Sequence, residues 1–194
     1  MSNGSILFDF YGGLAKGENS IPYWENMLEI IRIVNEFFEK IFDISAMRYH
    51  YPIIIDNIDG RCSGYAPVTV PFFGLVLCIK LRQNRTYDKC SIVFEYAHEL
   101  THAMFFYELG INKFDADTDE EAICTAMSLI CVKKLMDKDS NRLPQFESIV
   151  KNNTKYRAGY ALVRECEYNV TRLKSKFDEY CRQYCDKNSV DIAS

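Results

Sequence analysis

Two histidines one helical turn apart are the side chains of this sequence best suited to chemistry. His98 and His102 enclose Glu99 in the segment Ala-His-Glu-Leu-Thr-His-Ala, residues 97–103. Positions four apart on an α-helix are separated by about 40° around the axis and about 6 Å along it. Both imidazoles therefore project from one face and can bind the same metal ion. Glu99 points to the side of that ion, where its carboxylate can reach a bound water.

A pair of surface histidines beside a solvated Glu99 is the alternative interpretation. The chain has only 3 histidines, so two of them rarely fall into this pattern by chance. Because buried imidazoles need polar partners, burial of this segment would favour metal binding. The flanking residues predict such burial, since most are large and apolar: Ile92, Val93, Phe94, Tyr96, Leu100, Met104, Phe105 and Phe106.

A third ligand must come from another part of the chain, since a catalytic zinc usually has three protein ligands and one open position. His50 is the remaining histidine, but it lies in a predicted strand and is the weaker candidate. Glu121 is the stronger candidate, because it lies where the next predicted helix begins. The first turn of an antiparallel helix can pack beside the helix that carries the histidines.

The start of this second helix permits two capping arrangements. Thr118 with Glu121, or Asp117 with Glu120, can each form a capping box, in which the first residue caps the helix and the glutamate reaches back. The second arrangement leaves Glu121 free to bind a metal. Glu120 is the main competitor for the position of third ligand.

These residues resemble the zinc-binding motif of the gluzincin metallopeptidases, of which thermolysin is the type enzyme. In that family the third ligand is a glutamate about twenty residues after the second histidine. Glu121 follows His102 by 19 positions, the spacing of the aminopeptidase branch. The resemblance covers about residues 90–130. It implies a zincin-like fold, Zn²⁺ bound by His98, His102 and Glu121, Glu99 as general base, and a peptide or protein substrate.

One position departs from the family pattern. Thermolysin-like enzymes have an aspartate four positions after the third ligand, hydrogen-bonded to the first histidine, whereas this chain has Thr125. A hydroxyl can accept that hydrogen bond but adds no charge, and such partners tune metal affinity and activity. Together with the short chain, this makes the sequence more similar to compact gluzincins and ImmA-like regulatory metallopeptidases than to digestive enzymes.

Two tyrosines are candidates for stabilising the oxyanion of an attacked carbonyl. Gluzincins commonly use a tyrosine or histidine located after the glutamate helix, and Tyr156 and Tyr160 lie in that part of this chain. Gly159 would allow close approach of the backbone there. The alternative is that both rings pack in the helical core, since the chain has 13 tyrosines to accommodate.

The spacing of apolar residues predicts an α+β fold, with helices gathered on one side of a small, mainly antiparallel sheet. We expect a single domain over residues 1–194. Zincins usually bind an extended substrate along an edge strand, and residues 75–81 are the candidate strand. The predicted elements are a loop-like stretch over 1–20 with a short strand at 6–10, a helix over 22–42, strands at 48–56, 65–70 and 75–81, a hairpin turn at 71–74, an active-site helix over 88–109, a glutamate helix over 118–136, a short helix from Pro144, and a long C-terminal helix over 155–187.

Composition and charge exclude several classes of function. A net charge of −4 gives no electrostatic support for nucleic-acid binding. No apolar run approaches the roughly 18–20 residues that span a bilayer, and the first residues lack the basic region of a signal peptide. We therefore expect a cytoplasmic protein with no membrane partner, whose 8 cysteines stay reduced. Cys181 and Cys185 share a helix face, but further ligands for a second metal site are missing nearby.

Three functional hypotheses fit these patterns. The leading one is a zinc-dependent metallopeptidase that hydrolyses peptide bonds with a water activated by Glu99. The alternative is a regulatory zinc protein that acts through a protein partner and cuts narrowly or not at all. In a third, the chain belongs to a defence, toxin or stress-response system and cleaves one particular protein.

Overall fold

A computed structural model of the chain describes residues 20–42, 53–58, 68–72, 76–82, 89–110, 113, 115–136 and 142–189. The short strand expected at 6–10 lies outside these residues, as does the alternative ligand His50. Within them, the chain folds into helices and three strands, which confirms the predicted α+β class. The helices are α1 (Ser20–Phe38), α3 (Lys89–Leu109), α4 (Thr118–Leu135), α5 (Leu143–Asn152), α6 (Arg157–Glu165) and α7 (Val170–Ser189).

The three strands form one sheet in the order β1-β3-β2, where β1 is Ile53–Ile58, β2 is Val68–Phe72 and β3 is Val76–Arg82. β2 and β3 are antiparallel, as expected of a hairpin, and β1 adds a parallel pairing on the other side of β3, so the described sheet is mixed and not mainly antiparallel as predicted. Pro71 and Phe72 lie inside β2, and not in a turn.

The prediction that residues 75–81 form an edge strand for substrate binding is wrong, because β3 is the central strand of the sheet. Its side chains pack into the core, with Leu77, Ile79 and Leu81 nearly fully buried. β2 lies at an edge of the three described strands. Pro71 suits an edge strand, because proline has no backbone N–H with which to hydrogen-bond a further strand.

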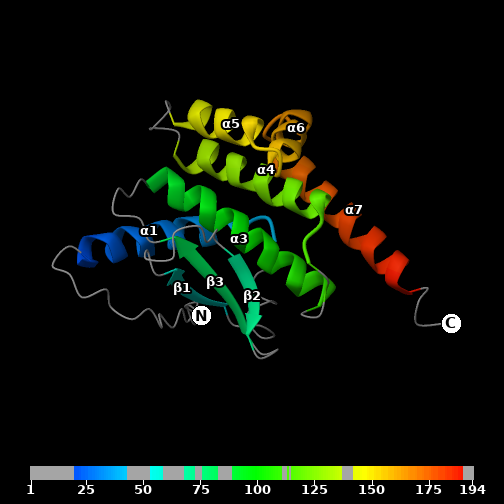
Figure 1. Ribbon diagram of the computed structural model, residues 1–194, viewed down its shortest axis with the longest axis horizontal. Helices are drawn as coiled ribbons and strands as arrows, with labels where there is room; N and C mark the ends of the chain where they lie inside the picture. Colours follow the sequence, from blue (N-terminus) through cyan, green and yellow to red (C-terminus); the bar gives the residue numbers. More distant parts are fainter. Residues whose placement is uncertain are drawn as a thin grey trace.

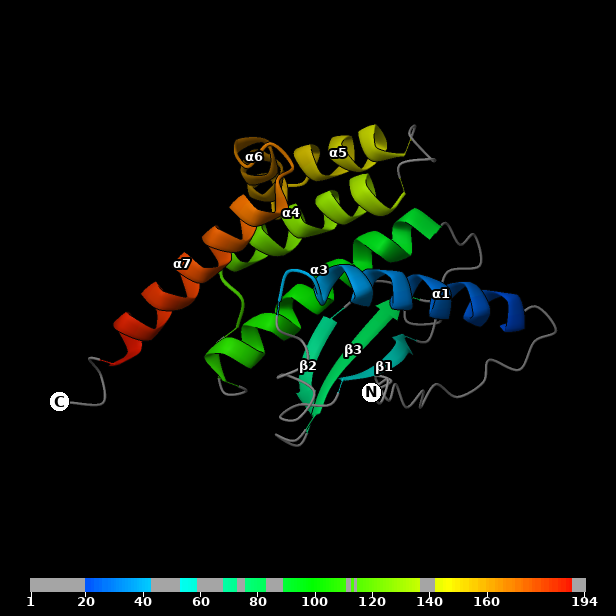
Figure 2. The same ribbon diagram turned by 180° about the vertical axis from the view of Figure 1, so that it is seen from behind.

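The helices are stacked on one side of the sheet in layers. Figure 1 shows α3 between the sheet and α4, with α5 and α6 beyond α4. α1 packs against α3, and Figure 2 shows it crossing in front of α3 and the sheet when the molecule is seen from behind. α7 runs away from this stack to the C-terminus. No helix in the described part of the chain is both long and apolar enough to cross a membrane.

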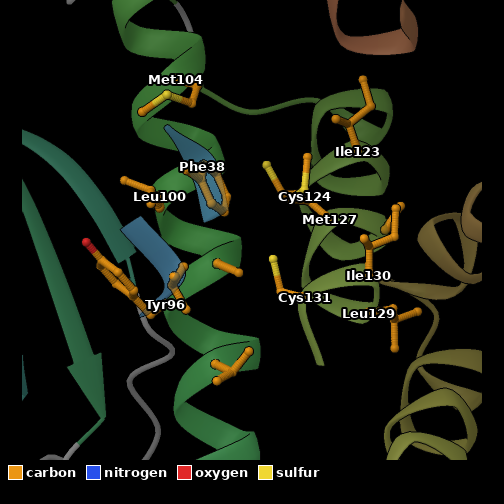
Figure 3. Packing of buried hydrophobic residues seen from close by; sticks show 14 of the residues in the cluster. Phe38, Tyr96, Leu100, Met104, Ile123, Cys124, Met127, Leu129, Ile130 and Cys131 are labelled. Carbon is orange, nitrogen blue, oxygen red and sulfur yellow. The ribbon is translucent and has the colours of Figure 1, made fainter. Parts of the chain in front are cut away.

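α3 and α4 are buried around most of their circumference, because other elements cover them on several sides. Every residue of α4 from Ala122 to Val132 is buried. Figure 3 shows Cys124 and Cys131 pointing from α4 toward α3, whereas Leu129 and Ile130 point to the other side of the helix. These thiols are free and behave as small apolar side chains, as expected.

One polar pair ties α1 to α3 inside the core. The hydroxyl of Tyr96 donates a hydrogen bond of 2.8 Å to Oδ1 of Asn35, and both residues are buried. Burial raises the pKa of Tyr96 well above its usual range, so the hydroxyl stays protonated and can donate. The pair holds the middle of α3, which carries the histidines, against the first helix.

The predicted C-terminal helix over 155–187 is two helices, α6 and α7, separated by a turn at 166–169. Glu167 and Tyr168 adopt the left-handed conformation there, with φ of 53° and 55°. The buried Tyr168 donates a hydrogen bond from its hydroxyl to Oε1 of Glu147 on α5. Nζ of Lys133 on α4 lies 4.0 Å from the centroid of the Tyr168 ring. These tertiary contacts stabilise a break that the sequence does not mark with glycine or proline.

Candidate metal centre

The two histidine rings on α3 meet as their spacing predicts. The Nε2 atoms of His98 and His102 lie 3.2 Å apart, and the ring centroids are separated by 4.9 Å. Each residue is only 8 % exposed, so the interpretation as surface histidines is wrong. Two ring nitrogens that face each other at this distance need a proton or a cation between them.

Glu121 reaches the histidines from the first turn of α4. Its Oε2 atom lies 3.3 Å from Nε2 of His98, and ligand atoms of His98, His102 and Glu121 all lie within 4.8 Å of one another. The same Oε2 atom is buried and has no hydrogen-bond partner in the described part of the chain. A desolvated carboxylate oxygen without a donor is costly. These three side chains could hold a metal ion, which would supply the missing partner.

Two of the three distances between ligand atoms suit a small, tetrahedrally coordinated ion. Metal–nitrogen and metal–oxygen bonds of about 2.0–2.1 Å in a tetrahedral site place neighbouring ligand atoms about 3.3 Å apart. The two closest pairs in this cluster, at 3.2 and 3.3 Å, match that edge length. The donor set of two imidazoles and one carboxylate is also the set of known catalytic zinc sites.

Glu120 orients His102 and does not join the ligand cluster. Its Oε1 atom lies 2.7 Å from Nδ1 of His102, which donates the hydrogen bond. The neutral ring then carries its lone pair on Nε2, the atom that faces His98. The ammonium of Lys113 lies 2.9 Å from the other oxygen of Glu120, and both side chains are almost fully buried. Glu120 is therefore the hydrogen-bond partner of His102, and not the third ligand of the competing prediction.

The capping of α4 explains how consecutive glutamates reach different targets. Asp117 is the N-cap, and its carboxylate accepts hydrogen bonds from the backbone N–H groups of Asp119 and Glu120. The arrangement with Thr118 as cap is therefore wrong. Because neighbouring positions differ by 100° around a helix, Glu120 and Glu121 approach the histidines from different sides.

Glu99 follows His98 on α3, and a strand holds its side chain. It is 4 % exposed, and the hydroxyl of Thr69 on β2 lies 2.9 Å from its Oε2 atom and 2.8 Å from its main-chain oxygen. The edge strand therefore fixes the side chain that the motif assigns to proton transfer. Thr69 lies 30 positions before Glu99, and nothing in its sequence surroundings marks it as part of a site.

The turn before α6 brings Lys155 and Tyr156 into contact with the ligand cluster. Nζ of Lys155 lies 3.0 Å from Oε1 of Glu121, and the ring of Tyr156 packs edge-on against His98 with centroids 5.7 Å apart. Tyr160 packs against the hydrophobic core. Of the two tyrosines predicted to act in catalysis, the structure thus brings Tyr156 to the cluster.

Thr125 does not act as the expected hydrogen-bond partner of His98. Its hydroxyl oxygen is buried without a hydrogen-bond partner among the described residues. The side chain instead packs against α6, because a Cβ atom added at Gly159 would lie 2.4 Å from Cβ of Thr125 and 2.9 Å from the main-chain oxygen of Ala122. Gly159 allows the close approach of the two helices, as predicted.

The electrostatics of the cluster keep Glu121 ionised. Burial acts to raise the pKa of Glu121, but the close contact and charge of His98, the hydrogen bond from Lys155 and the charge of His102 outweigh it and lower the pKa to about 2. Burial, followed by the charges of Glu120, Glu121 and Glu99, raises the pKa of the Cys124 thiol well above its usual range. A carboxylate ligand is thus ready in its charged form beside a thiol that stays neutral.

Among the described residues, His98, His102 and Glu121 are the one group whose ligand atoms could hold a metal. Cys181 is partly buried and Cys185 is exposed, and neither belongs to such a group. Comparisons of the chain with protein-family models, with curated proteins and with solved structures give no match.

Proposed function

We propose that this chain is a zinc-dependent metallopeptidase with a zincin-like arrangement, in which Glu99 is the general base. One observation supports the proposal: a buried Glu121 oxygen without a hydrogen-bond partner among the described residues lies with two facing imidazole nitrogens in one cluster of ligand atoms, all within 4.8 Å of one another. Zinc is the metal that this donor set favours, since two histidines and one carboxylate leave a fourth position open.

In this proposal Glu99 is the group that transfers the proton. A zinc ion at this site would lower the pKa of a bound water and polarise a substrate carbonyl. Thr69 engages Oε2 of Glu99, which leaves Oε1 to take the proton from the attacking water. Glu99 then delivers that proton to the nitrogen of the leaving amine, so the carboxylate is regenerated. Its burial excludes competing solvent, which strengthens each electrostatic interaction.

The edge of β2 is the proposed place for an extended peptide. Thr69 of this strand contacts Glu99, so a peptide that pairs with β2 would pass beside the general base. β2 thus takes the substrate-binding role that was predicted for residues 75–81. Tyr156, which packs on His98, is the tyrosine that can approach the oxyanion of the attacked carbonyl.

The first test is metal analysis of the purified protein together with a cleavage assay on an unfolded protein substrate. We expect one zinc per chain in the parent, and Glu99→Gln should retain the zinc but lose cleavage by at least about 100-fold. Glu108→Gln is the matched control, because Glu108 is an exposed glutamate on the same helix. Equal cleavage by Glu99→Gln and the parent would refute the mechanism, and a parent without zinc would refute the metal centre.

A regulatory zinc protein is the second candidate, and Thr125 is the observation that favours it. Thr125 stands where the peptidase pattern has a charged partner of His98, and its hydroxyl makes no hydrogen bond with any described residue. In that case the parent binds zinc but yields no new termini when it is incubated with a proteome and the products are read by mass spectrometry.

A further inference from the structure

Among the described residues, Lys155 is the lysine that contacts a predicted ligand of the metal centre. Its Nζ atom lies 3.0 Å from Oε1 of Glu121, while Oε2 of the same carboxylate faces His98. The Lys155 side chain is 59 % exposed, whereas that of Glu121 is 12 % exposed. The ammonium therefore approaches the buried carboxylate from the solvent side.

The backbone around Lys155 is held by a defined turn. Oδ1 of Asn153 accepts a hydrogen bond of 2.9 Å from the backbone N–H of Lys155, and the main-chain oxygen of Asn153 accepts from Tyr156 and Arg157. Gly159, in the first turn of the helix that follows, allows α6 to pack closely on α4. Because the turn is anchored at both points, the Lys155 side chain starts from a fixed position beside Glu121.

We propose that Lys155 is a positioning residue that restricts Glu121 to binding a metal through one oxygen. A carboxylate can bind a cation through one oxygen or through both. The ammonium occupies Oε1, and its positive charge repels a second cation from that oxygen, so Oε2 alone remains for the metal. Two imidazoles and one oxygen then fill three positions and keep the fourth for water.

This inference rests on the proposed function, and it concerns the coordination number of the metal in that site. Without Lys155, Oε1 is free to turn toward the metal and bind as a second oxygen. The metal would gain a fifth neighbour, and its fourth position would be crowded. Coordination geometry can be measured directly, because four-coordinate Co²⁺ absorbs more strongly in the visible range than five-coordinate Co²⁺ does.

The test is the visible spectrum of the full chain loaded with Co²⁺, with Lys155→Met and Lys155→Arg as the variants. We expect a several-fold loss of absorbance per bound Co²⁺ in Lys155→Met, while Lys155→Arg keeps the parent spectrum because arginine retains the charge and the donors. Lys151→Met, at an exposed lysine of α5, is the matched control and should leave the spectrum unchanged. Thermal melts of all four proteins establish that each is folded.

The outcomes separate this proposal from the proposed function. A parent that binds Co²⁺, with a Lys155→Met spectrum identical to it, overturns the role of Lys155 and leaves the metal centre intact. A parent that binds neither Co²⁺ nor Zn²⁺ overturns both. A loss of absorbance in Lys151→Met equal to that in Lys155→Met also overturns the role, since the effect would then be one of surface charge.

Discussion

The buried triad of His102, Glu120 and Lys113 offers the sharpest test of this structure, through the variant Glu120→Gln. The Glu120 and Lys113 side chains are 1 % and 2 % exposed, and their charged atoms lie 2.9 Å apart. Glu120→Gln removes the negative charge and leaves the Lys113 ammonium in the interior. Breaking a buried ion pair in this way costs about 3–5 kcal/mol, a large part of the roughly 5–15 kcal/mol by which a domain is stable.

The same substitution has a second, separable effect on metal binding. A glutamine can still accept from Nδ1 of His102, but it lacks the charge that makes the ring a better ligand. Loss of such a partner weakens metal affinity by about 10–100-fold. The double variant Glu120→Gln/Lys113→Met should recover most of the stability, since both charges are gone, while metal affinity stays low.

Urea unfolding in the presence of a chelator measures the first effect, and competition with a zinc indicator measures the second. Asp119→Asn is the matched control, because Asp119 is an exposed carboxylate in the same turn of α4, and it should cost less than about 1 kcal/mol. A Glu120→Gln protein as stable as the parent would refute the buried triad. Recovery of metal affinity in the double variant would refute the role of Glu120 as the partner of His102.

Two further predictions concern metal removal and helix packing. Zinc at 100 times its dissociation constant should add about 2.7 kcal/mol, or roughly 5–10 °C in Tm, and a chelator should reverse this in the parent and in Asp119→Asn. Glu121→Gln should show little of this shift, and a full shift in that variant would argue against Glu121 as a ligand. Gly159→Ala should destabilise the protein by about 1–3 kcal/mol in urea unfolding, because its Cβ would lie 2.4 Å from Thr125. If that site were open, alanine would instead stabilise the helix by up to about 1 kcal/mol.

The convergence of His98, His102 and Glu121 was predictable because it depends on short-range geometry. A helix turns a spacing of four residues into a shared face, and a short connection after Gly110 returns the chain beside that face. Gly110 has φ of +91° and ends α3 where the sequence indicates. The helices and the hairpin strands were predictable for the same reason, since their apolar periodicity is local.

Other features could not be read from local patterns. The break between α6 and α7 depends on Tyr168 packing against α4 and α5, because its sequence has no glycine or proline and its local signal is Asn169, which caps the start of α7. The order of the strands depends on where β1 joins the sheet, which the hairpin of β2 and β3 leaves undetermined. Both were set by contacts between segments far apart in the chain.

By itself, the sequence determined which side chains can bind a metal, because residue type and helical spacing decide that chemistry. The tertiary structure alone decided how those side chains are supported. Packing brought Glu120 into contact with His102, Thr69 with Glu99 and Lys155 with Glu121. In each pair the two residues come from different segments of the fold. The physical reason is that a hydrogen bond or ion pair requires atoms to lie within about 3 Å, and only the packing of whole helices and strands sets distances that finely.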